Sequence, residues 1–160
     1  MRIHLELEEM GVLAKLSKLI EHGEDLSPVM EAIAELGKDK AIQSFNTQTS
    51  PSGGKWKPSW RAQHQGGKTL IDKGILKGSI GTAFDAHSAA WGFGMKYGVV
   101  HQLGATIKPK NGKFLAFTGA DGHLRFAKEV NIPARPSLPD SIDQLDQPAI
   151  NDILTAYLSL

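Results

Sequence analysis

The chain has 160 residues, of which 41% are hydrophobic and 22% charged, with no cysteine and a formal net charge of +1. This composition is typical of one soluble domain, which we place at residues 1–160, and the missing cysteines exclude disulfides, thiolate metal sites and a cysteine nucleophile. No apolar run approaches the ~18 residues that span a bilayer, and the acidic N-terminus lacks the apolar centre of a signal peptide, so we expect a protein that is made and used inside a cell.

The first part of the chain predicts one strand and two helices. Residues 2–8 alternate between apolar and polar side chains, as in a half-buried strand. In residues 9–22 the apolar side chains recur every three or four positions, which is typical of one face of a helix. A second helix is predicted from Ser27, as the N-cap, with Pro28 at the first helical position, to about Phe45.

Residues 46–68 predict a long irregular loop, and loops of this length in a compact domain are usually functional or disordered. The loop contains Trp56 and Trp60. Two tryptophans argue against simple disorder, because their side chains need a place of burial in this subunit or in a neighbour.

The rest of the chain predicts a hairpin-rich antiparallel sheet and a closing helix. The expected elements are a helical turn at 71–76, strands at 79–84 and 88–94 joined by a turn at 85–87, a short helix at 97–103, strand-like segments at 105–108 and 113–117 around an Asn-Gly turn, a strand at 123–130, and a last helix from Pro148. The fold class is therefore α+β, with two N-terminal helices, an antiparallel sheet, the long 46–68 loop and a C-terminal helix.

No arrangement of residues predicts a cofactor, a metal or a catalytic site. The six histidines have no helical ligand spacing, and no HExxH or GxSxG motif occurs. Residues 66–69 resemble the end of a phosphate-binding loop but lack its first glycine and a preceding strand. A hydrolase built on His101 with a carboxylate is a remaining hypothesis, and it requires a shifted His101 pKa in a cleft.

The charges are unevenly distributed along the chain. Residues 1–37 carry 3 Lys/Arg against 8 Asp/Glu, residues 38–77 carry 8 against 2, residues 78–138 carry 7 against 3, and residues 139–160 carry 0 against 4. Opposite-sign patches of this kind suit head-to-tail self-association or a charged partner. Alternatively, the acidic ends and the basic middle neutralise each other within one subunit.

The basic segment 55–77 has interleaved aromatic residues, which is a pattern of nucleic-acid binding. Lysines would contact phosphates and a tryptophan would stack on a base. Two alternatives remain. The tryptophans can anchor a solvated loop to the body of the protein, or the loop can contact another protein, because Trp and Arg are over-represented in interface anchors.

Several patterns follow one another in a fixed order. They are Pro-x-Gly-x-x-Trp-x-Pro at 51–58, Leu-x-x-x-Gly-x-Leu-x-x-Ser at 70–79, a strand ending in Gly-Phe-Gly at 92–94, the segment 97–104, and Ile-Pro-Ala-Arg-Pro at 132–136. In these patterns the chain, from Ile3 to Leu158, resembles the phage virion morphogenesis family, the tail-completion or neck proteins of Mu-like and related tailed phages. It departs from the family pattern at Ser137 and Pro139, where Phe and Gly would be favoured.

The resemblance implies a non-enzymatic structural protein of the head–tail joining region or tail end. It implies self-assembly into a ring, for which a hexamer would match the tail symmetry, and docking onto tail or head–tail connector proteins. The protein would be found in the virion, and in the host cytoplasm during assembly. We expect no membrane partner, and nucleic-acid binding through residues 55–77 is the alternative function.

Within this interpretation, seven residues are candidates for partner contacts: Trp56, Trp60, Arg61, Tyr97, His101, Gln102 and Arg135. Tyr97 and His101 lie one helical turn apart and share a face. Arg135 lies between two prolines in an extended segment, which suits a fixed donor to a carboxylate of the same or a neighbouring subunit. For Tyr97, His101 and Arg135 the sequence does not separate an intrachain from an intersubunit role.

Overall fold

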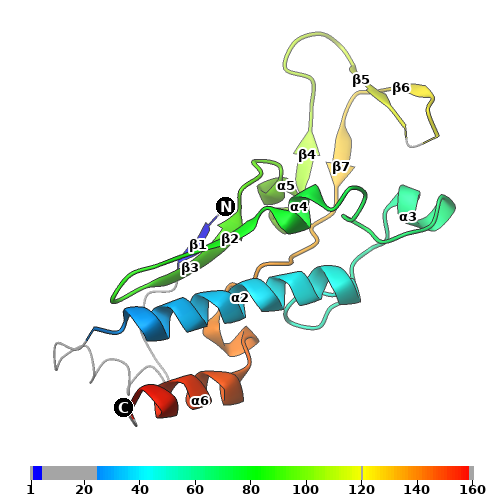
Figure 1. Cartoon of the computed structure of the whole chain (residues 1–160). Coiled ribbons are helices and arrows are strands. Elements are labelled where there is room, and N and C mark those ends of the chain that lie inside the picture. Colours follow the sequence, from blue (N-terminus) through cyan, green and yellow to red (C-terminus); the bar gives the residue numbers. More distant parts are fainter. Residues whose placement is uncertain (1, 5–24, 120, 159–160) are drawn as a thin grey trace.

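The computed structural model describes residues 2–4, 25–119 and 121–158 (Figure 1). The described elements are, in chain order, β1 (Arg2–His4), α2 (Ser27–Thr47), α3 (Trp60–His64), α4 (Ile75–Gly78), β2 (Ile80–Phe84), β3 (Ala89–Phe93), α5 (Gly98–Leu103), β4 (Ala105–Ile107), β5 (Leu115–Thr118), β6 (Leu124–Ala127), β7 (Val130–Ile132), a 3-10 turn at Ile142–Gln144, and α6 (Gln147–Leu158). The strand pairs of the described residues are all antiparallel, and together with the helices they confirm the α+β prediction. The predicted helix at 9–22 and the second half of the first strand lie outside the described residues.

Helix α2 forms the centre of the structure. It lies between the three-stranded sheet, in the order β1-β3-β2, and helix α6 (Figure 1). Its buried residues recur every three or four positions, which is why the sequence predicted a helix here. Met30, Ile33 and Phe45 are at most 3% exposed, and each contributes roughly 1.5–3 kcal/mol by its burial.

The predicted start of α2 is wrong by one residue. The N-cap residue is Leu26, and Ser27 already belongs to the helix. The N-cap side chain makes no capping hydrogen bond to the first turn. The Asp25 carboxylate instead accepts a hydrogen bond of 3.0 Å from the Ser27 amide, so an acceptor two residues upstream takes the place of the expected serine hydroxyl. The helix ends at Thr47, and its C-cap residue, Gln48, has a left-handed backbone with φ 63°.

The 46–68 segment is not wholly irregular, because it contains α3. The Ser59 hydroxyl accepts a hydrogen bond of 3.2 Å from the Ala62 amide and so caps this helix. A five-residue helix has too few turns to give a periodic signal, and the sequence analysis therefore missed it.

The hairpin of β2 and β3 is confirmed, including its turn, in which the Asp85 carboxylate accepts from the amides of His87 and Ser88. The expected local pairing around the Asn-Gly turn is wrong. Strand β4 pairs with β7, and β5 pairs with β6, so the predicted strand at 123–130 is divided between two ladders. The result is a stem, β4 and β7, that carries a hairpin away from the body of the protein (Figure 1). We call residues 108–129, which include this hairpin, the arm.

The C-terminal part returns from the stem across the body. Residues 133–139 form an extended segment, here called the strap, which leads to α6. Helix α6 begins one residue before the predicted Pro148, and Ile150 and Leu154 are buried as expected. In the part of the chain that the structure describes, no helix is long and apolar enough to cross a membrane.

Candidate functional site

The strap is held in place by side chains from three distant segments. The indole nitrogen of Trp56 donates to the carbonyl of Pro136, and that of Trp91 donates to the carbonyl of Pro139, each at 2.9 Å. Trp56 is 6% exposed and Trp91 is fully buried. The 46–68 segment, the sheet and the strap are therefore one connected unit, and Trp56 anchors its loop within the subunit.

Gln102, on α5, is the third holder of the strap. Its side-chain oxygen accepts from the amides of Ser137 and Leu138 at 3.0 and 3.1 Å, and its side-chain nitrogen donates to the Leu138 carbonyl at 3.0 Å. The side chain is 6% exposed. A buried amide that satisfies three backbone groups at once fixes α5 against the strap.

Arg135 is also buried, with 6% of its surface exposed. Its Nε donates to the Lys57 carbonyl at 2.8 Å, and its backbone amide donates to the His101 carbonyl at 2.7 Å. Burial lowers the pKa of Arg135, but a guanidinium stays protonated in proteins. Among the described residues no carboxylate forms an ion pair with it, so the expected carboxylate partner stays a prediction.

Three of the other candidates meet at the surface. Arg61, Tyr97 and His101 line one pocket of about 360 Å³ between α3, α4 and α5. The remaining lining residues are Ser59, Leu70, Asp72, Lys73, Gly74, Ile75 and Leu76. We call this hollow the α4–α5 pocket. Sequence reasoning placed Tyr97 and His101 on one helix face, but nothing in the sequence joined Arg61 to them.

The rim of this pocket combines exposed apolar groups with backbone strain. Ile75 is 53% and Tyr97 45% exposed. Leu70 has φ 62°, a left-handed conformation that costs a branched residue roughly 1–2 kcal/mol. Such strain persists where the surrounding structure fixes it, and it is concentrated at functional positions.

His101 forms the inner wall of the pocket. Its ring lies edge-on to Tyr97 with the centroids 6.2 Å apart, and its buried Nδ1 has no hydrogen-bond partner among the described residues. Burial, and secondly the charge of Arg135, lower the pKa of His101 below its ordinary value of 6.5. The lowered pKa favours the neutral form of the ring at pH 7.

The lowered pKa of His101 matches one expectation of the hydrolase hypothesis. Asp72 lines the same pocket, but in the described ranges no carboxylate accepts a hydrogen bond from the His101 ring. A catalytic histidine is normally oriented by such a group. Burial accounts for the shift without a catalytic role.

Trp60 and Arg61 lie on α3, at the edge of the molecule that faces the arm. Arg61 donates to the carbonyls of Lys68 and Ile71 at 2.6 and 2.7 Å, and so closes the 61–71 loop. Trp60 stacks on His64, with ring centroids 4.5 Å apart, and lines a small hollow together with Phe117 and Arg125 of the arm. The two loop tryptophans thus differ, since Trp56 is an internal anchor and Trp60 a surface residue that is 44% exposed.

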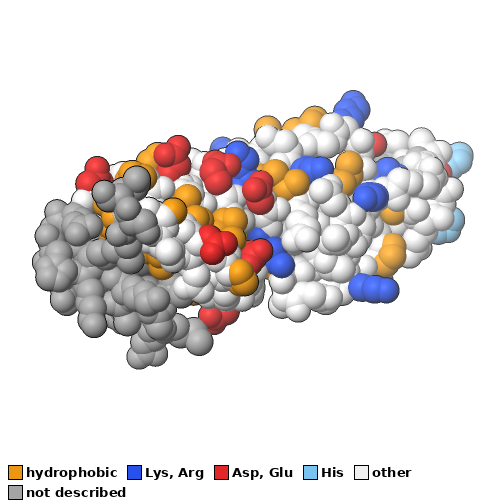
Figure 2. Space-filling view, turned by 60° about the horizontal axis from the view of Figure 1, so that its bottom comes forward, with side chains coloured by type: hydrophobic (Ala, Val, Ile, Leu, Met, Phe, Trp, Pro, Cys, Tyr) orange, Lys and Arg blue, Asp and Glu red, His pale blue; other side chains and the backbone are white. Residues whose placement is uncertain are grey.

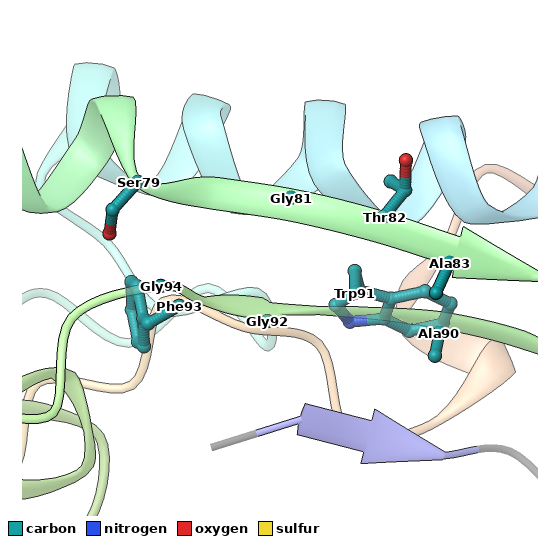
Figure 3. Close-up of a pocket in the computed structure, with 9 residues that line it drawn as sticks. All are labelled: Ser79, Gly81, Thr82, Ala83, Ala90, Trp91, Gly92, Phe93 and Gly94. Carbon is teal, nitrogen blue, oxygen red and sulfur yellow. The ribbon is translucent and has the colours of Figure 1, made fainter.

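A further hollow, which the sequence analysis did not anticipate, lies on the sheet itself. It is formed by β2 and β3, where Gly81, Gly92 and Gly94 leave the backbone without side chains (Figure 3). Also missed were the apolar side chains of the arm, because their alternation reads as that of a half-buried strand. No group of His, Asp or Glu side chains in the described residues is arranged to bind a metal ion.

Comparison with known proteins identifies a family. A sequence model of the phage virion morphogenesis family matches residues 7–159. No curated protein and no solved structure matches the chain.

Proposed function

The chain belongs to the phage virion morphogenesis family, and on this premise we propose that it is a non-enzymatic structural protein of the head–tail joining region or tail end. It acts by assembling into a ring and by docking onto tail or head–tail connector proteins. The family match covers nearly the whole chain and supports a role in building the virion. The ring, its position and its neighbours are our proposal.

The observation that carries the proposal is the separation of charge in the folded subunit. Acidic side chains gather on the half that contains α2 and α6, and Lys and Arg predominate on the other half (Figure 2). The exposed acidic residues of the first half include Asp25, Glu31, Asp39, Asp140, Asp143, Asp146 and Asp152. A subunit with opposite charges at its two ends favours head-to-tail contacts over two-fold pairing.

Among the described residues, no ion pair joins the acidic half to the basic half. The ion pairs of the described residues are Glu35–Lys38 within α2, Lys108–Glu129 across the base of the arm, and Asp121–Arg125, which joins the hairpin turn to β6. None of them joins α6 to the basic half. Between two copies, a heterologous contact of the acidic half with the basic half forms a ring if its rotation closes.

The α4–α5 pocket is the proposed docking position for a tail or connector protein. It offers the exposed apolar side chains of Ile75 and Tyr97 beside the neutral ring of His101. Trp56, Gln102 and Arg135 hold the strap and α5, and they act as supports for this surface. An apolar side chain of a partner would fill the hollow, because desolvated aromatic pockets are where interface energy concentrates.

Removal of the gene from the phage genome tests the function. We expect infected or induced cells to accumulate heads and tails that do not join, or tails with abnormal ends, as seen by electron microscopy. Complementation with the wild-type chain should restore joined particles. Complementation with Tyr97→Ala should restore few, although the variant folds. Normal infectious particles without the gene would overturn the proposal.

Nucleic-acid binding through the 55–77 segment is less well supported. Trp56 is buried and cannot stack on a base. The Lys68 ammonium donates to the Asn46 carbonyl at 2.6 Å, and Arg61 is bonded to two carbonyls. Several groups that would contact phosphate or base are thus already engaged within the subunit. Tight, salt-sensitive DNA binding that Lys55→Glu abolishes would revive this alternative.

A further inference from the structure

The arm carries an apolar face that nothing in the described part of the subunit covers. In the ladder of β5 and β6, Ala116 lies opposite Phe126 and Thr118 opposite Leu124. Residues opposite one another in an antiparallel pair share a face. Phe126 is 65% and Leu124 63% exposed. Phe114, two positions before Ala116, continues the same alternation and is 51% exposed.

The other face of this hairpin has a partner within the subunit. Phe117 lies opposite Arg125, and both line the small hollow with Trp60 of α3. The arm is thus supported from one side only. A two-stranded hairpin is marginally stable in water by itself, and contiguous exposed apolar groups usually mark an interaction site. We call the face with Phe114, Ala116, Leu124 and Phe126 the free face of the arm.

The charge around the free face indicates the kind of surface that covers it. Lys113 and Lys128 flank the hairpin, are both exposed, and form no ion pair with a described residue. Residues 108–129 carry five Lys/Arg, namely Lys108, Lys110, Lys113, Arg125 and Lys128, against Asp121 and Glu129. A complementary surface is apolar in part and acidic at its edges.

Helix α6 has these properties. Pro148, Asp152 and Ala156 are spaced by four residues, so they share one face of the helix, and all three are exposed. Ile153 and Tyr157 beside them are half-buried. Residues 139–160 contain four Asp and no Lys or Arg. Figure 2 shows hydrophobic side chains among the acidic ones on this half of the molecule.

We infer that the free face of the arm of one copy docks onto α6 of a second copy of this chain. The arm and α6 lie at opposite ends of one subunit (Figure 1), so the contact cannot form within a subunit and joins copies head to tail. The free face contributes apolar area, and Lys113 and Lys128 meet Asp143 and Asp152. This inference rests on the proposed self-assembly and names the surfaces that would carry it.

A charge exchange between two variants tests the contact. The first variant carries Lys113→Glu and Lys128→Glu on the arm, and the second carries Asp143→Lys and Asp152→Lys near α6. Each variant alone brings like charges together and should be monomeric by mass photometry. An equal mixture should assemble again, because each arm then meets a surface of opposite charge. Lys55→Glu with Lys96→Glu, which alters the same number of exposed lysines elsewhere, should assemble like the wild type.

The apolar part of the contact has its own test. Leu124→Ser with Phe126→Ser should weaken association at least about tenfold at an unchanged melting temperature. Phe84→Ser, on an exposed aromatic residue of β2, should leave association unchanged. If circular dichroism shows that the Leu124→Ser, Phe126→Ser variant is unfolded, the mixture of the two charge variants still tests the contact.

The outcomes separate this inference from the proposed function. Assembly of the wild type together with normal assembly of both charge variants would overturn the arm contact and leave the ring proposal intact. A wild-type chain that stays monomeric at its solubility limit would overturn the contact between copies, while the gene deletion decides the role in the virion. If Lys113→Glu with Lys128→Glu abolishes DNA binding but leaves assembly unchanged, the arm binds nucleic acid. That result would also overturn the inference.

Discussion

The indole ring of Trp91 lies directly against the backbone of α2 at Gly37. A Cβ atom built on Gly37 would stand 2.3 Å from Cδ2 of Trp91, closer than real Cβ contacts allow. Trp91 also donates to the carbonyl of Pro139 in the strap. One side chain thus fixes the distances between the sheet, the central helix and the strap that supports the α4–α5 pocket.

Gly37→Ala should destabilise the protein, although alanine favours a helix interior over glycine by roughly 1 kcal/mol. The added methyl group has no room beside the buried indole, and overpacking of a core costs typically about 1–3 kcal/mol. The melting temperature should fall. In Gly78→Ala the new Cβ would meet no atom within 4 Å, so this control should be neutral or slightly stabilising. Equal melting temperatures for the two variants would refute the close packing.

Gln102→Leu should destabilise the protein, although the two side chains are similar in size. The change leaves the amides of Ser137 and Leu138 and the carbonyl of Leu138 without their side-chain partner. Each buried unsatisfied group costs about 1–3 kcal/mol, and we expect a loss of about 3 kcal/mol in the free energy of unfolding. Gln43→Leu, at an exposed position of α2, serves as the control in urea denaturation. A loss below about 1 kcal/mol would mean that Gln102 does not hold the strap.

The stability of the protein should depend on pH through His101. Burial lowers the pKa of this histidine in the folded state, so the unfolded chain binds a proton at a higher pH than the folded one does. The stability that neutral His101 contributes is fully present above the unfolded pKa of 6.5, and it is lost as the pH falls toward the lower pKa of the folded state. The melting temperature of the wild type should fall as the pH is lowered from about 7 to about 5, and that of His101→Gln should fall less steeply. NMR titration giving an ordinary or raised His101 pKa would contradict the expectation.

Salt should weaken self-association if opposite-charge surfaces join the copies. Between about 0.1 M and about 1 M salt the Debye length falls from about 10 Å to about 3 Å, which screens exposed charges. Size-exclusion chromatography with light scattering should therefore show fewer assembled copies at high salt. Association that strengthens with salt would point to a purely apolar contact.

The sequence predicted those helices and strands that are determined by the residue pattern within their own segment. The apolar period of α2, the alternation and turn of β2 and β3, and the amphipathic pattern of α6 are all local signals. The Asn-Gly turn at 111–112 favoured pairing of its neighbours, but Asn-Gly is only a local preference. The pairing of β4 with β7 joins residues on either side of a whole hairpin, and no local signal encodes it.

The candidate residues were predicted by type but not by role. The loop residues Trp56, Trp60 and Arg61 were named because Trp and Arg often anchor interfaces, and Tyr97 and His101 because they share a helix face. Only the structure separates Trp56, Gln102 and Arg135, which are buried in the subunit, from Trp60, Tyr97 and His101, which reach its surface. The apolar residues of the arm were overlooked, since alternation alone does not tell whether anything covers a strand face.

Gold labelling of this protein on particles from an induced lysate, viewed by electron microscopy, tests the central claim most directly. The account predicts label at the head–tail junction or at the tail end of intact particles. An immunoblot of purified particles guards against a buried epitope. Particles that contain none of the protein by both methods would contradict a structural role in the virion.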